Sequence, residues 1–204
     1  AITDTGAAMA EASISTGTGG GLVGVSDLDV VSRVGLVDAA DAGSQASATR
    51  AFVDHDAQVS AQNLTLEADA DTEAKAESIA PLTFGGVAAV SATNVTGKAA
   101  HDTEAFVGDD VTLTLGGALV IDAFATTTAT PRSANFSASL GVSVTDSEVT
   151  TLIDSDTSAY IGDGGTISAG SVKVKAEATH DAQATVKSAG AAGLVTIGSI
   201  LATA

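Results

Sequence analysis

Hydrophobic and polar residues alternate along several stretches of the chain. The clearest is 172–178, Val-Lys-Val-Lys-Ala-Glu-Ala, where every apolar side chain falls on one face and every charged one on the other. A period of two is that of a half-buried β-strand, whereas an amphipathic helix repeats every 3.6 residues. Alanine is abundant, but it is interleaved with Thr, Ser, Asp and β-branched residues that lower helix stability. The pattern therefore predicts an all-β protein with Gly-, Asp-, Asn- and Ser-containing turns.

These predicted strands recur with a fixed period. Phe52, Phe106 and Tyr160 stand in the similar runs Ala-Phe-Val-Asp, Ala-Phe-Val-Gly and Ala-Tyr-Ile-Gly, and successive aromatic residues are 54 positions apart. The chain contains only five Phe and one Tyr, so chance does not account for three in register. A repeat of this length indicates stacked structural units. We therefore treat 1–204 as one continuous repeat segment, with a partial module at 1–50 and modules at 51–104, 105–158 and 159–204.

The match extends beyond the aromatic residues. Each module also contains an alternating apolar run, which is Leu64, Leu66, Ala68, Ala70 in the first, Leu119, Ile121, Ala123, Ala125 in the second and Val172, Val174, Ala176, Ala178 in the third. The second module needs one extra residue, at Gly116-Gly117. The partial module has about 11 additional residues between Val30 and Ala51, and we expect 38–44 to be an exposed loop insertion.

Short strands repeated in this way predict a β-solenoid (β-helix) in which each module of about 54 residues supplies two unequal coils. Neighbouring coils would stack about 4.8 Å apart. The many alanines predict a thin interior, with Leu, Ile and Phe in a few wider layers. A β-sandwich is the alternative, because its strands alternate in the same way. Neither end resembles a cap, so we expect further coils, or copies of the same protein, to stack beyond Ala1 and Ala204.

Composition excludes several classes of function. The chain has 25 Asp and Glu against eight Lys and Arg, a formal charge of −17, so it lacks the basic surface that nucleic acid requires. Without cysteine it has no disulfide, thiolate metal site or cysteine nucleophile. It also contains no uninterrupted run of 18 apolar residues, so we expect no transmembrane segment.

Acidic turns are the candidate chemistry. Asp54, Asp56, Asp109, Asp110 and Asp163 fall at equivalent corners of successive modules. Stacked carboxylates repel one another unless a cation or solvent screens them, and hard oxygen ligands at a turn suit calcium. Calcium is therefore the one cofactor that the sequence suggests. The alternative is that aspartate forms these turns and keeps the surface soluble.

No catalytic constellation can be identified. The histidines, His55, His101 and His180, occupy unrelated module positions, which predicts scattered surface residues and no repeated ligand set. No serine stands in a nucleophile elbow, and the eight Lys and Arg do not converge, so we predict that the protein is not an enzyme. The threonine run 126–130 would suit ice binding only if every module repeated it.

One element supports a family resemblance. The Ala-[Phe/Tyr]-[Val/Ile]-Gly-Asp element occurs at 105–109 and 159–163, and the copy at 159–163 is followed by an Ile-Ser-Ala-Gly turn and by Val-x-Val-x-Ala-x-Ala. Together they resemble the repetitive stalks of giant bacterial surface adhesins, the filamentous-haemagglutinin-like and leukotoxin-type filamentous adhesins. That resemblance implies a β-helical fibre that is secreted, lies outside the cell or on its surface, and has a spacer or adhesive role. Host or surface glycans are the implied partners.

The leading hypothesis is accordingly a structural or adhesive segment of such a fibre, a stiff spacer that assembles end to end. The competing class is a carbohydrate-active or carbohydrate-binding β-helix, and an ice-binding solenoid is a minor alternative. A spacer is expected to repeat the same surface along its length. An enzyme is expected to break that symmetry with one groove where charged residues meet.

Overall fold

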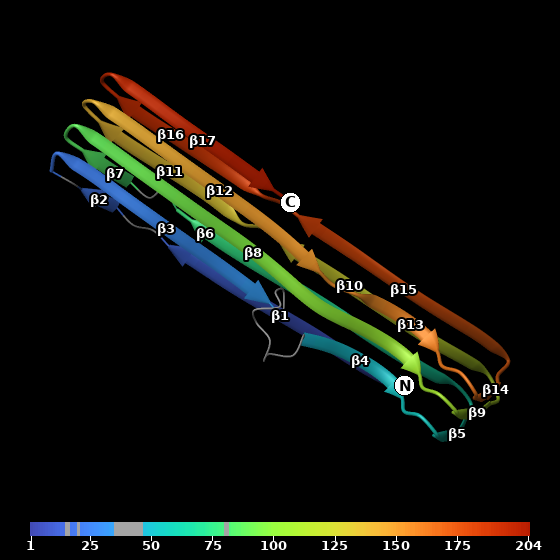
Figure 1. Ribbon diagram of the computed structural model, residues 1–204. Helices are drawn as coiled ribbons and strands as arrows, with labels where there is room; N and C mark the ends of the chain where they lie inside the picture. The colour runs from blue at the N-terminus through green and yellow to red at the C-terminus, as the bar shows by residue number, and fades with distance from the viewer. Residues whose placement is uncertain (15–16, 20, 35–46, 80–81) are drawn as a thin grey trace.

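The computed structural model describes residues 1–14, 17–19, 21–34, 47–79 and 82–204. The described chain is all-β, and its strands pair in parallel (Figure 1). It goes round the molecule three times along the same path and follows that path for part of a fourth circuit, and we call each circuit a rung. The prediction of an all-β protein is confirmed, and the parallel pairing gives a β-helix-like arrangement. It does not fit the β-sandwich alternative, whose strands pair antiparallel.

The strands follow one another in the same order in each rung. The first rung contains β1 (Ile2–Ile14), β2 (Gly17–Gly19), β3 (Val23–Val34), β4 (Ser47–Val53) and β5 (Gln58–Ala61). The second contains β6 (Leu64–Ser78), β7 (Leu82–Gly85), β8 (Ala88–Val107) and β9 (Thr112–Leu115). The third contains β10 (Ala118–Ala129), β11 (Arg132–Ser139), β12 (Val142–Asp154), β13 (Thr157–Ile161) and β14 (Thr166–Ser168). The fourth contains β15 (Ser171–Ala182), β16 (Thr185–Ala192) and β17 (Val195–Thr203).

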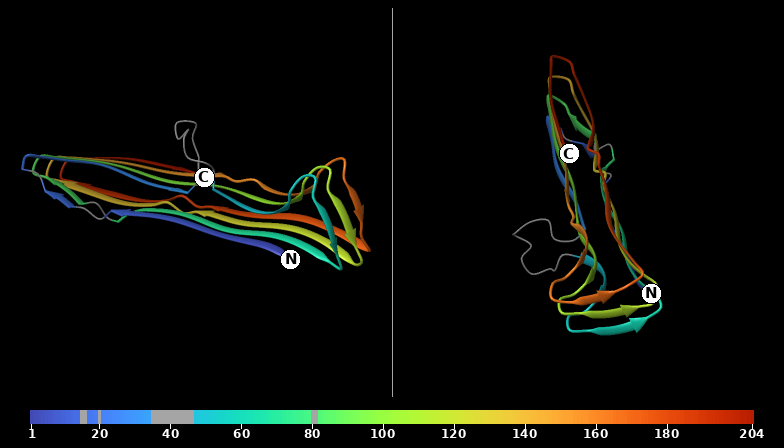
Figure 2. Two further views of the ribbon diagram at one scale, coloured as in Figure 1. Left: turned by 90° about the horizontal axis from the view of Figure 1, so that it is seen from below. Right: turned by 90° about the vertical axis from the view of Figure 1, so that its right-hand side faces the viewer.

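Equivalent strands of successive rungs form three sheets. Sheet 1 contains β1, β2, β6, β7, β10, β11, β15 and β16, sheet 2 contains β3, β4, β8, β12, β13 and β17, and sheet 3 contains β5, β9 and β14. Sheets 1 and 2 are long and face each other, and the short sheet 3 closes the molecule at one end (Figure 2). At the opposite end, which we call the narrow end, the chain turns directly from sheet 1 into sheet 2, at 21–22, 86–87, 140–141 and 193–194.

The register confirms the repeat. Phe106 lies beside Phe52 and Tyr160, the aromatic residues one repeat length before and after it. In sheet 1, Leu119 lies between Leu64 and Val172. The first of these two steps is one position longer than the repeat and the second is one position shorter, as expected from the extra residue near Gly116. The strands are thus aligned by the same residues that align the sequence.

The additional residues of the partial module fall at one place. Val34 pairs with Ala99, an offset of 65, whereas Ser47 pairs with His101, an offset of 54. The difference, 65 − 54 = 11 residues, lies between β3 and β4. The predicted loop at 38–44 lies outside the described residues.

The prediction of two unequal coils in each module is wrong. Throughout the last three rungs, hydrogen-bonded neighbours are one repeat length apart to within a single position, so each module goes round once. The strands are longer than the turn residues suggested, because β8 continues for 20 residues through Asn94 and Gly97 without a break. Each module therefore adds about 4.8 Å of stacked length, one strand spacing.

The interior changes character along the long axis of a rung. Near sheet 3 it contains large aliphatic side chains, and Leu66, Leu113 and Ile121 are fully buried there. Each such burial stabilises the fold by about 1.5–3 kcal/mol. In the middle the facing sheets are separated mainly by alanine, as at Ala74 and Ala99. The thin interior predicted from the alanine content is confirmed.

The narrow end has a polar interior. The buried side chains there are Thr83, Ser91, Asn135, Ser137 and Ser143. They bond to one another and to their neighbours: Ser91 Oγ donates to Asn135 Oδ1 at 2.7 Å, and Ser137 Oγ lies 3.1 Å from Thr145 Oγ1. Because a buried hydroxyl is costly unless it is hydrogen-bonded, this network fixes how sheets 1 and 2 meet.

Phenylalanine does not occupy the wider layers of the core, contrary to the prediction. Ala51 and Val53 are buried, whereas Phe52 between them faces outward and is 41% exposed. No Phe is buried among the described residues, because sheets held apart by Ala and Ser leave no room for a ring.

Candidate functional site

The five predicted aspartates lie on three stacked turns between sheets 2 and 3. The turns cover 54–57, 108–111 and 162–165. Asp56 and Asp110 have a φ of 57° and Gly164 has a φ of 75°, so one position of each turn is left-handed. The turns are bonded through the backbone: the N–H of Asp56 donates to the carbonyl of Asp109 at 3.0 Å, and that of Asp110 to Asp163 at 2.8 Å. Aspartate and glycine tolerate this conformation better than most residues, which explains their recurrence.

Two of the carboxylates are engaged within the turns. Asp109 Oδ1 accepts a hydrogen bond from the backbone N–H of Asp163 at 2.9 Å. Asp54 Oδ1 accepts from the backbone N–H of His55 at 2.9 Å and lies 2.8 Å from its Nδ1. The side-chain hydrogen bond with His55 lowers the pKa of Asp54, and the same bond raises the pKa of His55. These carboxylates organise the turns whether or not a cation is present.

The aspartates do not form one continuous column. Asp54 follows Val53, and the residues that follow its paired neighbours Val107 and Ile161 are glycines, Gly108 and Gly162. In the described part of the chain, no three His, Cys, Asp or Glu side chains are grouped closely enough to hold a metal ion. Calcium binding at these turns remains a prediction.

An outer aromatic ladder lies beside the turns, made of Phe52, Phe106 and Tyr160. The ring centroids of Phe52 and Phe106 are 5.1 Å apart and those of Phe106 and Tyr160 4.9 Å apart, with the planes within 8° of parallel. Next to it, Arg50 Nε lies 2.7 Å from Glu104 Oε2. Burial, and then the charge of Glu104, raise the pKa of Tyr160. Because the rings cover each other's faces, the ladder presents mainly ring edges to solvent.

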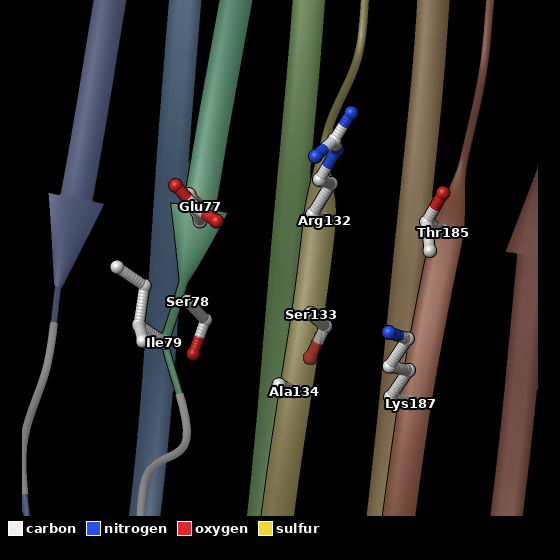
Figure 3. A pocket seen from close by; sticks show the side chains of 8 residues that line it. All are labelled: Glu77, Ser78, Ile79, Arg132, Ser133, Ala134, Thr185 and Lys187. Atoms are coloured by element: carbon white, nitrogen blue, oxygen red, sulfur yellow. The ribbon is translucent and has the colours of Figure 1, made fainter.

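Two basic residues converge on sheet 1, contrary to the expectation from the sequence. Arg132 of β11 and Lys187 of β16 line a surface hollow of about 390 Å³ together with Glu77 of β6 (Figure 3). Ser78 and Ser133 also line it, and their buried hydroxyls have no hydrogen-bond partner among the described residues. The one carboxylate at this hollow is not the flanking pair that glycoside hydrolases use.

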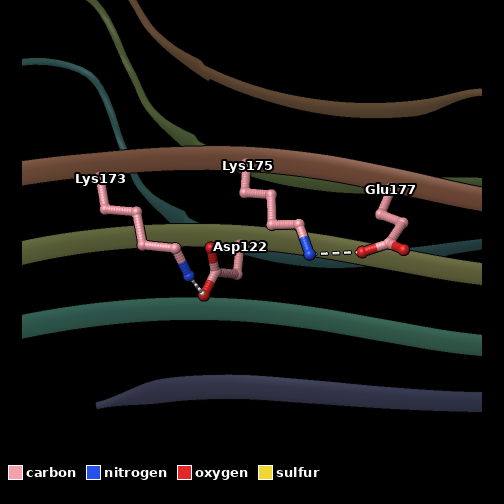
Figure 4. Close-up of polar contacts among 4 residues, drawn as sticks. All are labelled: Asp122, Lys173, Lys175 and Glu177. Carbon is pink, nitrogen blue, oxygen red and sulfur yellow. Dashed lines mark hydrogen bonds and ion pairs between the residues drawn. The ribbon is translucent and has the colours of Figure 1, made fainter.

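Two further basic residues of sheet 1, Lys173 and Lys175, are held in local ion pairs on its outer face. Lys173 Nζ lies 2.8 Å from Asp122 Oδ2, and Lys175 pairs with Glu177 (Figure 4). Lys175 Nζ also lies 5.0 Å from the centre of the Phe124 ring. Such exposed pairs contribute little stability, and they leave no cation aimed at a shared substrate position.

The surface location predicted for His101 is wrong. Its side chain is 5% exposed, with Nε2 2.9 Å from Thr49 Oγ1 and Nδ1 in contact with the Ser47 hydroxyl. Burial lowers the pKa of His101. The signal was in the sequence, because position 101 is in phase with Ala99 and Ala105, two alternating residues that also face inward. His55 and His180 are exposed, as predicted.

The threonine run is not continued by the neighbouring rungs. Thr126 lies between Asp71 and Thr179, and Thr128 lies between Glu73 and Asp181, so threonine neighbours threonine at one of these four contacts. A flat threonine array therefore does not form on this face of sheet 1.

Comparison with protein families, curated proteins and solved structures found no match to this chain. The resemblance to surface adhesins therefore rests on the repeat motifs alone. In the described part of the chain, no helix has the length and hydrophobicity needed to cross a membrane.

Proposed function

We propose that this chain is a structural or adhesive segment of a secreted or cell-surface fibre, in which a β-solenoid acts as a spacer. The observation that carries the proposal is that equivalent positions of successive modules stack in register in all three sheets. Each module repeats the path of the one before and adds the same small rise. The motif resemblance to adhesin stalks supports a location outside the cell.

Open edges on the outermost rungs support end-to-end stacking. The strands of the first and fourth rungs each have a neighbour on one side only. Val172 and Val174 of β15 are 51% and 43% exposed, although the equivalent Leu119 and Ile121 of β10 are fully buried. A further rung, from the same chain or from a copy, would pair the free backbone groups and cover these side chains.

Duplication of one module tests this proposal. A second copy of residues 105–158, inserted after residue 158, is expected to form one more rung, lengthen the particle by about 4.8 Å and raise the urea midpoint. Small-angle X-ray scattering and circular dichroism provide the readouts. The matched control inserts the same segment with each inward residue exchanged for its outward neighbour, which abolishes the buried face. An intact repeat that adds no length, or no more stability than its control, would contradict the spacer function.

The competing function is carbohydrate binding, and the hollow beside Arg132 and Lys187 favours it, because that hollow breaks the repeat symmetry. Calorimetric titration with neutral and acidic oligosaccharides distinguishes the two. Binding that is lost in Arg132→Ala but kept in Lys173→Ala, a cation of the same sheet, would favour this candidate.

A further inference from the structure

The narrow end is apolar on the outside and polar on the inside, which reverses the usual arrangement. Its interior contains the hydroxyl and amide network of Ser91, Asn135 and Ser137. At its turns, Leu22, Leu140 and Leu194 are 74%, 81% and 81% exposed. The chain is also uncharged over 82–97, 133–145 and 188–204, although charged residues make up 16% of it. An exposed apolar region of this extent marks an interaction surface.

The outer face of sheet 1 at this end, which we call face 1, combines apolar residues with a basic border. Leu82 and Phe84 of β7 are 40% and 47% exposed, and the Phe84 ring meets that of Phe136 edge-on at 6.4 Å. The alternation then leads to Lys187, which lies beside Ala134, and to Arg132. Neither cation forms an ion pair within the described part of the chain, and Glu77 is the carboxylate beside Arg132.

Two hollows indent this face. One is the hollow at Arg132 described above. The second, of about 230 Å³, lies between β11 and β16 and is lined by Phe136, Lys187 and Ala189, among others. Face 1 is therefore a surface with concave positions next to unpaired positive charges.

The outer face of sheet 2 at this end, which we call face 2, is apolar with an acidic border. Val25, Val90 and Ile197 are 63%, 37% and 55% exposed and share a column with the half-buried Val144. The next two outward positions of the alternation are acidic in the first and third rungs: Asp27, Asp29, Asp146 and Glu148. The border of face 2 is therefore negatively charged, opposite in sign to the basic border of face 1.

The two borders lie at matching distances from the turn. Across the interior, the Ser137 hydroxyl contacts both Ser143 and Thr145, which places Ser137 level with Val144 and Phe136 one residue farther from the turn. One step farther along each sheet, Lys187 lies within one residue of the level of Asp146. A second step brings Arg132 within one residue of the level of Glu148. A copy moved sideways without rotation would therefore place its acidic rows over these basic residues.

We propose that face 1 of one copy packs on face 2 of a second copy at the narrow end, with the sheets about 10 Å apart. The apolar columns are removed from water, and Lys187 and Arg132 pair with Asp146 and Glu148 of the neighbour. Because the contact uses two different faces, it repeats and produces a side-by-side ribbon of copies. This association is lateral and separate from the stacking of rungs proposed above. A lipid surface fits less well, because the acidic border repels anionic headgroups and the open strand edges have no partner in lipid.

Complementation of two variants tests the proposal. Phe84→Lys disables face 1, and Val90→Lys disables face 2. In analytical ultracentrifugation, each variant alone is expected to lose lateral association by about tenfold or more, whereas their mixture forms 1:1 dimers through the one intact pair of faces. Leu152→Lys is the matched control, because Leu152 is 39% exposed on the same outer face but outside the apolar region. It is expected to associate like the unmodified protein.

Charge variants provide a second test that leaves the apolar surface intact. Lys187→Glu and Asp146→Lys are each expected to weaken association, and the double variant to restore it, with the salt dependence that a polar border confers. Circular dichroism verifies that each variant is folded. Association that survives Phe84→Lys and Lys187→Glu, or a mixture that stays monomeric, would overturn the proposal. So would liposome binding that is lost in Val90→Lys while self-association is unchanged.

Discussion

Phe106 is the middle ring of the outer aromatic ladder and has two stacked neighbours, whereas Phe52 and Tyr160 have one each. A stacked aromatic pair contributes about 0.5–1.5 kcal/mol beyond the area that it buries. Phe106→Ala is therefore expected to lose about 1–3 kcal/mol in two pair contacts, and Phe52→Ala or Tyr160→Ala about half as much. For a chain of this size, 1 kcal/mol corresponds to roughly 2–4 °C in Tm.

Double-mutant cycles separate the pair contacts from the burial lost with each ring. The Phe52–Phe106 and Phe106–Tyr160 cycles are each expected to give coupling energies of about 0.5–1.5 kcal/mol. The Phe52–Tyr160 cycle is expected to be near zero, because Phe106 separates the two rings. Since the chain has no Trp, urea unfolding is best followed by far-UV circular dichroism. Equal coupling in all three cycles, or none in any, would refute the stacking of rungs one repeat length apart.

Three further predictions concern the turns and the interior. Gly164→Ala is expected to lower the free energy of unfolding by about 1–2 kcal/mol, because φ is 75° and the new Cβ would collide with Asp110 Oδ1. Asp110→Gly, at the equivalent position, is expected to change it by no more than about 0.5 kcal/mol. Similar urea midpoints for the two variants would contradict a left-handed conformation at this turn position. Burial lowers the pKa of His101, so below pH 6.5 the unfolded chain binds more protons than the folded one and the stability decreases as the pH is lowered. His101→Gln is expected to flatten this pH dependence of the unfolding free energy. A slope unchanged from that of the unmodified protein would exclude His101 as its source. If calcium screens the stacked turns, chelation is expected to lower Tm, and the decrease in Tm is expected to be smaller in Asp109→Asn. Identical melting curves with and without calcium would exclude calcium binding at these turns.

The repeat made most of the strand register predictable. The alignment of Leu64, Leu119 and Val172 in the sequence is their alignment in sheet 1, because one repeat length advances the chain by one rung. The number of coils was not predictable in the same way. A Gly or Asn within β8 has the composition of a turn, and its extended conformation is imposed by pairing with β3 and β12 on either side.

The candidate site was predictable in position but not in chemistry. The sequence placed Asp109 and Asp163 at stacked corners, yet the bond from the Asp163 N–H to the Asp109 carboxylate depends on the turn geometry. Period-two alternation also does not state which face is inside. Phe52 and Val90 face outward because Ala and Ser fill the narrow interior. Which of the two faces is buried depends on the spacing between sheets 1 and 2, and the sequence of a single strand does not specify that spacing.

The change of offset from 65 to 54 between β3 and β4 shows that the path length of a rung is adjustable at one joint. Both strands remain paired with β8 although the first rung has a longer connection there than its successors. Doubling the length of a flexible connection costs only about 0.6 kcal/mol in closure entropy. In the third rung the same place is the junction of β12 and β13, which is therefore a natural grafting point for a foreign peptide, and an array built from such modules would display its cargo at intervals of one strand spacing.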